Sequence, residues 1–299
     1  MFEIISIPDD APVQFEQMGT KYKFWYTGSD GERTLFKQGR PNTGENWAEK
    51  VCCELCSLLD LPHAHYEFAK WKEVNGVATP TIVPNGARLV HGNELLAGVN
   101  KYEAGKQYKV RGHTVRLVLA VIGNPDFDPP IGCNVPGEFT SASDFFVGYL
   151  MLDAWVSNQD RHHENWGLVV SQDGGVTLAP TFDHAASLGR NESDETRLDR
   201  LRTKDKGRSV EAYVERARSA LYKSSISKKP LTTSDAFNEA ARLRTDAASY
   251  WLSRLAGLSF DDIEAIFNNI PSGSMSDLAR EFAMKMLKIN LERLLTRGV

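Results

Sequence analysis

The sequence predicts an α+β protein of two lobes, a small β-rich lobe followed by a larger, mainly helical one. Three observations support this. The first third holds short segments of β-branched and aromatic residues between glycine-containing turns. Residues 143–156 are apolar on almost every face, which is typical of a central buried helix. The last third carries apolar residues at helical spacing. We place the two lobes at residues 1–92 and 93–299.

The composition is that of an ordinary globular protein. Of the 299 residues, 41% are hydrophobic and 25% are charged, which is sufficient for two lobes with cores. The net charge of −4 and the pI of about 6.0 give no general basic surface, so we expect no direct nucleic-acid binding. No apolar run approaches the roughly 20 residues that span a bilayer. The first residues also lack the pattern of a secretion signal, and we expect a cytoplasmic protein.

The first lobe is expected to open with a hairpin. Residues 21–27 form an aromatic strand, Gly28-Ser-Asp-Gly31 is a turn, and residues 33–38 form the returning strand. A helix over 45–60 follows. Further strands are expected at 65–71, 78–83 and 87–90, with an Asn75-Gly76 turn between the first two.

The predicted helix over 45–60 contains Cys52, Cys53 and Cys56. Cys53 and Cys56 have CxxC spacing, but no second pair follows. All three cysteines lie in an amphipathic helix. We therefore interpret them as buried thiols rather than as a zinc or redox motif. The four cysteines of the chain have no disulfide-framework spacing, as expected in a reducing compartment.

The second lobe is expected to be helical around one hairpin. The hairpin joins residues 166–170 to 176–178, and residues 124–137 form a loop. The segment 190–208 is highly charged and without apolar periodicity, so we interpret it as a solvated, mobile loop. The predicted helices of this lobe are 113–122, 143–156, 209–222, 233–255, 259–268 and 277–295.

Three polar residues follow the buried helix in an order that suits phosphoryl transfer. Asp160 and Asn165 lie five residues apart in a polar loop, and Asp183 follows a short apolar strand. Asp160 is placed to act as a general base toward a hydroxyl group. Asn165 and Asp183 offer the hard oxygen ligands that Mg²⁺ prefers. His162 lies inside the same loop, and we expect it to organise the loop by hydrogen bonding.

A cation for the phosphates of ATP is expected from the first lobe. Lys37 ends the returning strand, on the face opposite Phe36. Either Glu45 or Glu49 on the next helix could pair with Lys37, and we prefer Glu49 because it lies one turn inside the helix. The amides of the turn between Gly28 and Gly31 could cover the phosphates.

Together these residues predict a kinase that uses ATP and Mg²⁺. A metal-dependent phosphohydrolase is the alternative that the histidines suggest, because His162, His163 and His184 lie among the carboxylates. No HxxxH or HxxEH spacing is present, and a hydrolase has no need of Lys37. We therefore expect His163 and His184 to be cleft-side or surface groups.

Several motifs resemble those of the HipA-like kinases. They are Phe36-Lys37, Glu45-Asn-Trp47-Ala-Glu49, Leu58-Leu-Asp-Leu-Pro62-His-Ala64, Asp160-Arg-His-x-x-Asn165, Leu178-Ala-Pro180, Phe182-Asp183-His184 and Ala279-Arg-Glu-Phe282. The resemblance extends from about residue 21 to residue 295. It implies a bilobal protein-kinase-like fold and a bacterial or phage-borne serine/threonine kinase whose substrate is a protein.

The same resemblance implies roles for individual residues. Asp160 would be the catalytic base, Asn165 and Asp183 the metal ligands, and Lys37 the phosphate-binding lysine. The hinge that holds adenine would fall at His91, Gly92, Asn93 and Glu94. The chain has no room for the separate N-terminal subdomain of the HipA toxins, and it lacks a Ser-Gly-Val-Gln-type phosphate loop. A compact, stand-alone kinase of this type fits the sequence better.

Two further alternatives remain open from the sequence. The Asp160 loop is equally similar to that of the phosphoinositide 3- and 4-kinases, so a lipid substrate is possible, with the basic residues of 197–208 near the cleft. Acidic residues interrupt this basic segment, however, and reduce its field. Alternatively, a pseudokinase could act as a nucleotide-binding scaffold. A pseudokinase is expected to have lost some of its metal ligands, whereas Lys37, Asp160, Asn165 and Asp183 are all present.

Overall fold

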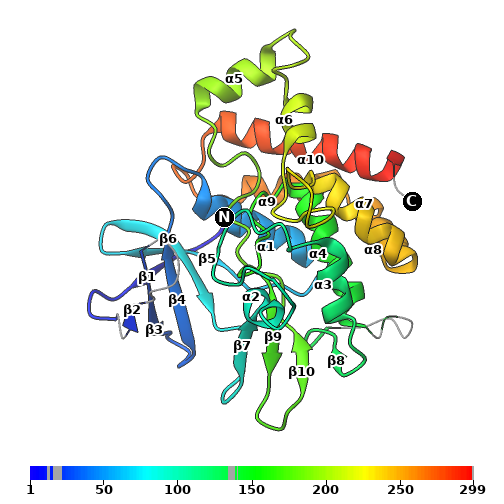
Figure 1. Cartoon of the computed structure of the whole chain (residues 1–299). Coiled ribbons are helices and arrows are strands. Elements are labelled where there is room, and N and C mark those ends of the chain that lie inside the picture. The colour runs from blue at the N-terminus through cyan, green and yellow to red at the C-terminus, as the bar shows by residue number, and fades with distance from the viewer. Residues whose placement is uncertain (12–13, 16–21, 134–138, 140, 298–299) are drawn as a thin grey trace.

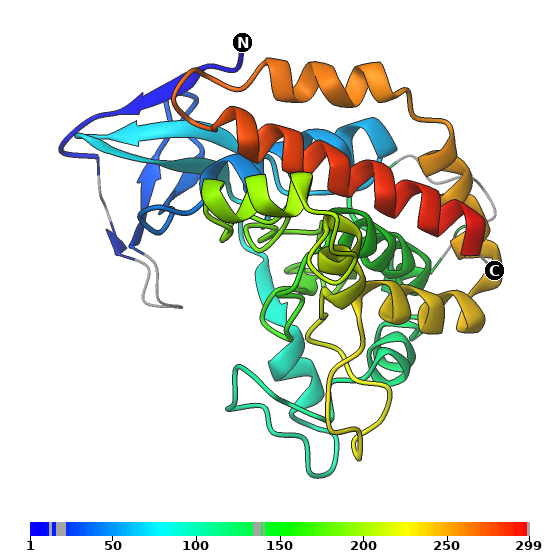
Figure 2. The same ribbon diagram turned by 90° about the horizontal axis from the view of Figure 1, so that it is seen from above.

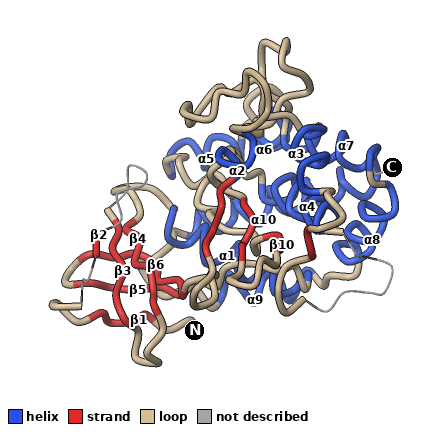
Figure 3. The backbone as a smooth tube through the Cα atoms, turned by 60° about the horizontal axis from the view of Figure 1, so that its bottom comes forward, coloured by secondary structure: helices blue, strands red, loops and turns tan. Residues whose placement is uncertain are grey.

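The computed structural model describes residues 1–11, 14–15, 22–133, 139 and 141–297. A β-sheet built from the first 80 residues lies on one side, and the helices pack together on the other (Figures 1 and 3). This arrangement confirms the predicted fold class, a β-rich N-terminal part with a helical C-terminal part. No helix in the described part of the chain is both long and apolar enough to cross a bilayer.

Among the described residues, the first sheet has six strands in the order β1-β5-β6-β4-β3-β2. One face of this sheet carries a small core, in which Phe24 and Phe36 are fully buried and lie against each other. The next residue, Lys37, points to the opposite face, as strand alternation requires. The strands are β1 (Ile4–Ile7), β2 (Gln14–Phe15), β3 (Lys23–Thr27), β4 (Arg33–Gln38), β5 (Glu67–Trp71) and β6 (Val74–Pro80).

The predicted turn at Asn75-Gly76 is wrong. β6 begins at Val74, so both residues lie inside the strand, and the turn is formed by Lys72 and Glu73. Lys72 has a positive φ of 53°, which the tight reversal requires. Gly76 is needed for close packing instead, because a Cβ there would lie 2.4 Å from the Lys37 carbonyl oxygen.

In the part of the chain that the structure describes, the second sheet contains four strands in the order β7-β9-β10-β8. β9 and β10 form the predicted hairpin. β7 pairs with β9, so the chain enters this sheet before residue 92, and the division of the lobes at that residue stays a prediction. The strands are β7 (Arg88–His91), β8 (Phe127–Asp128), β9 (Gly167–Val170) and β10 (Val176–Leu178).

The helix α4 (Ala142–Val156) is the centre of the helical part, and every one of its residues is buried. Figure 2 shows α10 running along one side of this part, and Asn290 on α10 donates to the Trp155 carbonyl of α4 at 2.8 Å. The remaining helices are α1 (Glu45–Leu59), α2 (Gly92–Leu96), α3 (Val115–Ile122), α5 (Asp194–Arg202), α6 (Val210–Arg216), α7 (Thr233–Leu243), α8 (Thr245–Ala256), α9 (Phe260–Asn268) and α10 (Asp277–Arg297).

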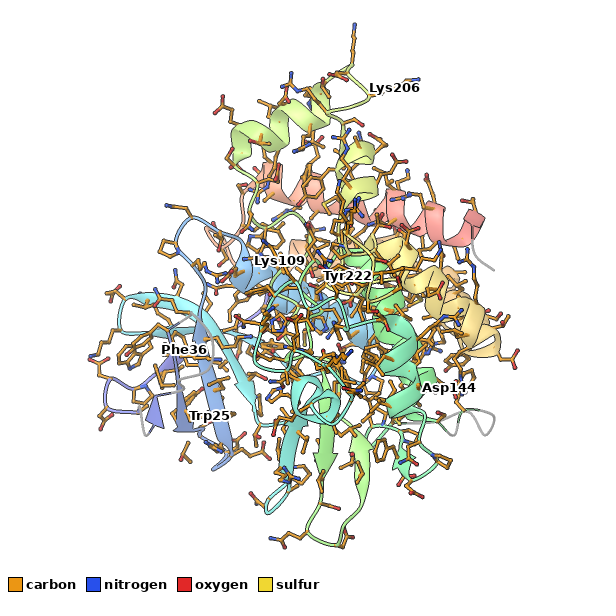
Figure 4. The ribbon with its side chains drawn as sticks, in the orientation of Figure 1. Trp25, Phe36, Lys109, Asp144, Lys206 and Tyr222 are labelled. Carbon is orange, nitrogen blue, oxygen red and sulfur yellow. The ribbon has the colours of Figure 1, made fainter. Side chains whose placement is uncertain are left out.

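The predicted mobile loop over 190–208 is wrong, because α5 lies within it. Ser193 caps this helix by accepting from the Thr196 amide, and its first turn is acidic. Lys206 lies at the tip of the connection that follows (Figure 4).

Two predicted helices are also revised. The helix over 209–222 is shorter, and the helix over 233–255 breaks at Arg244, where the chain leaves helical geometry. The predicted loop over 124–137 lies partly outside the described residues.

The three cysteines of α1 are buried, as predicted, but they are not equivalent. Burial raises the pKa of Cys52 and of Cys56. Burial also acts to raise the pKa of Cys53, but hydrogen bonds from His63 and His65 outweigh it and lower that pKa to about 7. Cys53 therefore has polar partners that the CxxC pattern did not indicate.

Candidate active site

A cavity of about 430 Å³ lies between the two sheets. The first sheet and its connections contribute Lys37 and Tyr66 to its lining, and the segments after α4 contribute Asp160, Asn165 and Asp183. The structure thus brings together predicted residues that are up to 146 positions apart, as for Lys37 and Asp183. The cavity also has an apolar wall that includes Leu35, Ile82 and Leu89.

The ammonium group of Lys37 lies between two carboxylates. Its Nζ is 2.7 Å from Glu49 Oε1 and 3.0 Å from Asp183 Oδ1. Burial by itself lowers the pKa of Lys37, but the charges of Asp183 and Glu49 raise it, and the net pKa is well above its usual value. Lys37 is therefore a fixed cation in the cavity.

Glu49, rather than Glu45, is the partner of Lys37. Glu45 instead accepts from the Arg40 guanidinium at 2.6 Å and from Arg190. The second oxygen of Glu49 accepts from the His184 amide at 2.8 Å. One carboxylate on α1 therefore orients the lysine and also fixes the backbone beside Asp183.

Asp183 has a left-handed backbone, with φ of 58°. Aspartate tolerates this region better than most residues, and such conformations persist where the surroundings hold them. Here the Asp183 amide donates to the Tyr66 hydroxyl at 3.3 Å. Tyr66 is 2% exposed, and its ring lies 5.4 Å from Lys37 Nζ. Tyr66 was not predicted as a site residue, because a tyrosine in the expected strand over 65–71 cannot be distinguished from an ordinary core residue.

A buried ion pair sets the shape of the loop that carries Asp160. Ser157 ends α4 with φ of 54°, and the chain then turns back on itself. Arg161 is fully buried and binds Asp153 of α4 through two nitrogens, each 2.8 Å from a carboxylate oxygen. Arg161 also donates to the Asn165 carbonyl at 2.8 Å. Asp153 and Arg161 were not singled out from the sequence, since the pairing depends on the fold.

The side chains of the loop face the cavity in a fixed arrangement. The Asn165 amide nitrogen donates to the Asp160 carbonyl at 2.7 Å, which leaves the Asn165 oxygen as its ligand atom. His162 Nδ1 accepts from the Glu164 amide at 3.1 Å, while its Nε2 lies 3.8 Å from Asp160 Oδ1. Burial lowers the pKa of His162, so it is neutral near pH 7.

The donor set fits a magnesium ion. Asp183 offers an anionic oxygen on a side chain that is 33% exposed, and Asn165 offers a neutral one. Both residues line the same cavity as Lys37. The histidines fit a different role: His163 and His184 are buried, not cleft-side or surface groups as predicted, because the loop folds inward around Arg161. His163 bonds the Tyr102 hydroxyl, and His184 bonds Thr181.

The structure does not bring the Gly28–Gly31 turn to the cavity. The Gly28 amide donates to the Glu32 carbonyl and the Gly31 amide to the Gly28 carbonyl, so both amides serve the hairpin itself. The cavity is lined further along the two strands, by Trp25, Arg33 and Leu35.

Of the four residues expected at the hinge, His91 alone lines the cavity. The Gly92 amide donates to the Trp166 carbonyl and the Asn93 amide to the His163 carbonyl. Glu94 accepts from the His91 amide at 3.1 Å as part of the cap of α2. The connection that lines the cavity comes earlier, between β6 and β7, where Thr81, Ile82 and Val83 face it.

Comparison with solved structures identifies the fold. The chain is similar to the proinflammatory kinase CtkA of Helicobacter pylori, with a TM-score of 0.73 and 20% identity over 98% of this chain and 96% of that one. The chain has a HipA-like kinase fold. It is also similar to HipA of Shewanella oneidensis MR-1, solved with HipB and operator DNA, with a TM-score of 0.58 and 11% identity.

The HipA likeness covers 96% of this chain but only 65% of HipA, so the toxin has structure that this chain does not match. A Golgi casein kinase is more distant, with a TM-score of 0.39 and 11% identity. No protein-family model and no curated protein matches the chain. The likeness to CtkA and HipA shows the fold, although the sequence identity to them is only 20% and 11%.

Proposed function

We propose that this chain is a protein kinase that transfers the γ-phosphate of ATP to serine or threonine hydroxyls, with Mg²⁺ as cofactor. This proposal rests mainly on the position of Lys37. Its Nζ lies 2.7 Å from Glu49 and 3.0 Å from Asp183, in a cavity that Asp160 also lines. A lysine aligned by a helix glutamate, beside a metal-binding aspartate, is the arrangement that protein kinases use for phosphoryl transfer.

Each residue has a distinct task in this proposal. Lys37 would bind the phosphates as a fixed cation and hold them in register. Asp160 would accept the hydrogen bond of the attacking hydroxyl and take up its proton. Asn165 and Asp183 would hold Mg²⁺, which supplies charge neutralisation on the phosphates when bound. The apolar wall at Ile82 and Leu89 would contact adenine.

The ion pairs of the basic segment 197–208 favour a protein substrate over a phosphoinositide. The arginines of 197–208 that would meet inositol phosphates already pair with acidic side chains. The pairs are Arg197–Asp194, Arg200–Glu192, Arg202–Glu281 and Arg208–Asp199. Since the field of such paired charges is small, this surface does not favour an anionic lipid headgroup.

The deciding experiment is incubation of the purified chain with γ-labelled ATP and Mg²⁺, with casein-type protein and phosphoinositide vesicles in parallel. Asp160→Ala is the first variant. We expect label on protein, including the chain itself, and a loss of turnover of about 10²–10⁴-fold in the variant, because a general base contributes that much. Nucleotide binding should survive in Asp160→Ala, whereas Asp183→Ala should also lose Mg²⁺-dependent nucleotide binding.

The outcomes separate the alternatives. Label on lipid alone would replace the protein substrate by a phosphoinositide. Bound ATP without label on any substrate would point to a pseudokinase. Equal loss of nucleotide binding in both aspartate variants would contradict the separate roles proposed for Asp160 and Asp183.

A further inference from the structure

A cysteine and two histidines converge at a second place, on α1 and the segment that leads from it to β5. They are Cys53, His63 and His65, and none of them lines the cavity. The Cys53 sulfur and one nitrogen of each imidazole all lie within 4.8 Å of one another. Three ligating groups from two segments therefore face a common point.

Hydrogen bonds fix which nitrogen of each imidazole is available. His63 Nδ1 lies 2.7 Å from the Leu61 carbonyl oxygen, which can only accept, so Nδ1 carries the proton and Nε2 keeps its lone pair. The Ser57 hydroxyl lies 3.2 Å from Nε2, but it can donate its proton to the Cys53 carbonyl instead, also at 3.2 Å, which leaves the Nε2 lone pair for an ion. His65 Nε2 lies 2.7 Å from Glu67 Oε1, so Nε2 is the donor there and Nδ1 is free to ligate. That Nδ1 lies 3.9 Å from Cys53 Sγ.

We propose that Cys53, His63 and His65 bind a Zn²⁺ ion, with water in the fourth position. Thiolate sulfur and imidazole nitrogen are its usual ligands, and bond lengths of about 2.3 and 2.0–2.1 Å place S and N about 3.5 Å apart in a tetrahedral site. The separation of 3.9 Å between Cys53 Sγ and His65 Nδ1 is close to this value and needs only a small closure.

The surroundings are those of a metal site. Glu67 orients His65 and is itself held by Lys50 Nζ at 2.8 Å, which is the carboxylate–histidine support that zinc ligands commonly have. The His65 side chain is 57% exposed and leaves a path for the ion. Cys53 is only 1% exposed, so a large substrate could not reach its sulfur, which argues against a nucleophilic thiol.

An ion here would clamp α1 to the segment behind the cavity. Cys53 lies one helical turn after Glu49, on the helix that orients Lys37. The residue after His65 is Tyr66, whose amide donates to Cys53 Sγ at 3.3 Å and whose hydroxyl accepts from Asp183. The ion would therefore hold these two segments together, and its binding is independent of whether the chain transfers phosphate.

The test is titration of the purified full chain with Co²⁺ in the absence of nucleotide, followed by displacement with Zn²⁺. A thiolate ligand gives Co²⁺ a near-ultraviolet charge-transfer band, which the oxygen ligands of Asn165 and Asp183 cannot produce. We expect this band to saturate at one ion per chain and Zn²⁺ to abolish it.

Variants then identify the ligands. Cys53→Ala should remove the band, and His65→Ala should weaken binding more than the loss of its supporting carboxylate does. Glu67→Gln should weaken it by about 10–100-fold, as loss of a supporting carboxylate does. Cys56→Ala is the matched control, since it removes a buried thiol from the same helix, and it should bind the metal normally.

Two results would overturn the proposal. One is the absence of the band in the folded protein. The other is a band that saturates at the same Co²⁺ concentration in His65→Ala as in the unaltered chain, since this variant should fold because its side chain is largely exposed. Asp160→Ala should bind the metal like the unaltered chain, so loss of kinase activity and loss of the metal site are distinguishable.

Discussion

At the scale of single residues, the site depends on charges that are buried and balanced. Lys37 is 9% exposed and Glu49 is 2% exposed in their side chains, so neither charge is compensated by water. A buried pair of this kind is costly to break from one side, because the remaining charge loses its partner. The same contact that would position ATP therefore also contributes to the stability of the fold.

Lys37→Met should lower the free energy of unfolding by about 3–5 kcal/mol, because Glu49 is left without its cation. Lys37→Met with Glu49→Gln should recover part of this loss, since the glutamine oxygen can still accept from His184. Urea denaturation of the single and double variants measures the coupling. Additive losses would contradict the idea that the two side chains act as a unit.

At the scale of elements, the pair between Asp153 and Arg161 joins α4 to the loop that carries Asp160. Arg161 reaches the Asn165 carbonyl at 2.8 Å and the Phe182 carbonyl at 3.4 Å. A fully buried guanidinium thus connects the buried helix, the loop and the residue that precedes Asp183. This side chain therefore helps to set the position of the candidate base, together with Asn158, whose side-chain oxygen accepts from the Asp160 amide at 3.1 Å.

Asp153→Asn should therefore lower the free energy of unfolding by about 3–5 kcal/mol, because Arg161 loses its charged partner in the interior. Asp60→Asn is the matched control. It removes a carboxylate that pairs with Arg254 at the surface, and we expect a change of about 0–1 kcal/mol. The two variants are compared by urea denaturation. A similar loss of unfolding free energy in both would show that the buried Asp153 pair contributes no more to stability than the exposed Asp60 pair.

Elements with a strong apolar pattern could be predicted from the sequence, whereas those held by polar contacts could not. The helix over 45–60 and the buried helix over 143–156 match α1 and α4 within one residue at each end. α5 could not be recognised, because ion pairs such as Arg197–Asp194 hold it instead of an apolar stripe.

The candidate site was predictable to a similar extent. The separation of Asp160, Asn165 and Asp183 along the chain pointed to one loop and one strand end, and the structure places all three in one cavity. Tyr66 and Arg161 carry no such signal, since their roles arise from contacts across the fold. The backbone amides at Gly92 and Asn93 are committed to internal hydrogen bonds, which no residue pattern reveals.

At the scale of the whole molecule, buried neutral histidines make the folded state less stable at low pH. His113 accepts a hydrogen bond from the Trp166 indole nitrogen at 3.0 Å, which requires an unprotonated Nε2. Burial, followed by the nearby His163, lowers the pKa of His113 to about 3. An unfolded histidine has a pKa of about 6.5, so the stability it contributes is present above that pH and is lost as the pH falls toward 3.

The free energy of unfolding should therefore fall between pH 7 and pH 5, and His113 alone should account for about 2 kcal/mol of the fall. His113→Gln keeps an acceptor for Trp166 but does not titrate. Its stability should change less over the same interval, although His162, His163 and His184 also have lowered pKa values. Equal slopes for both proteins, measured by urea denaturation at each pH, would refute the assignment.

The pairing of Lys37 with Glu49 has a consequence for control of the chain. In kinases this ion pair is often the step that regulation acts on. Here Glu49 holds both Lys37 and the His184 amide, so ordinary packing of α1 assembles the centre. Under the proposed function, the folded chain would already hold this ion pair without an activating partner. Its activity would then be controlled by its amount and by its access to substrate.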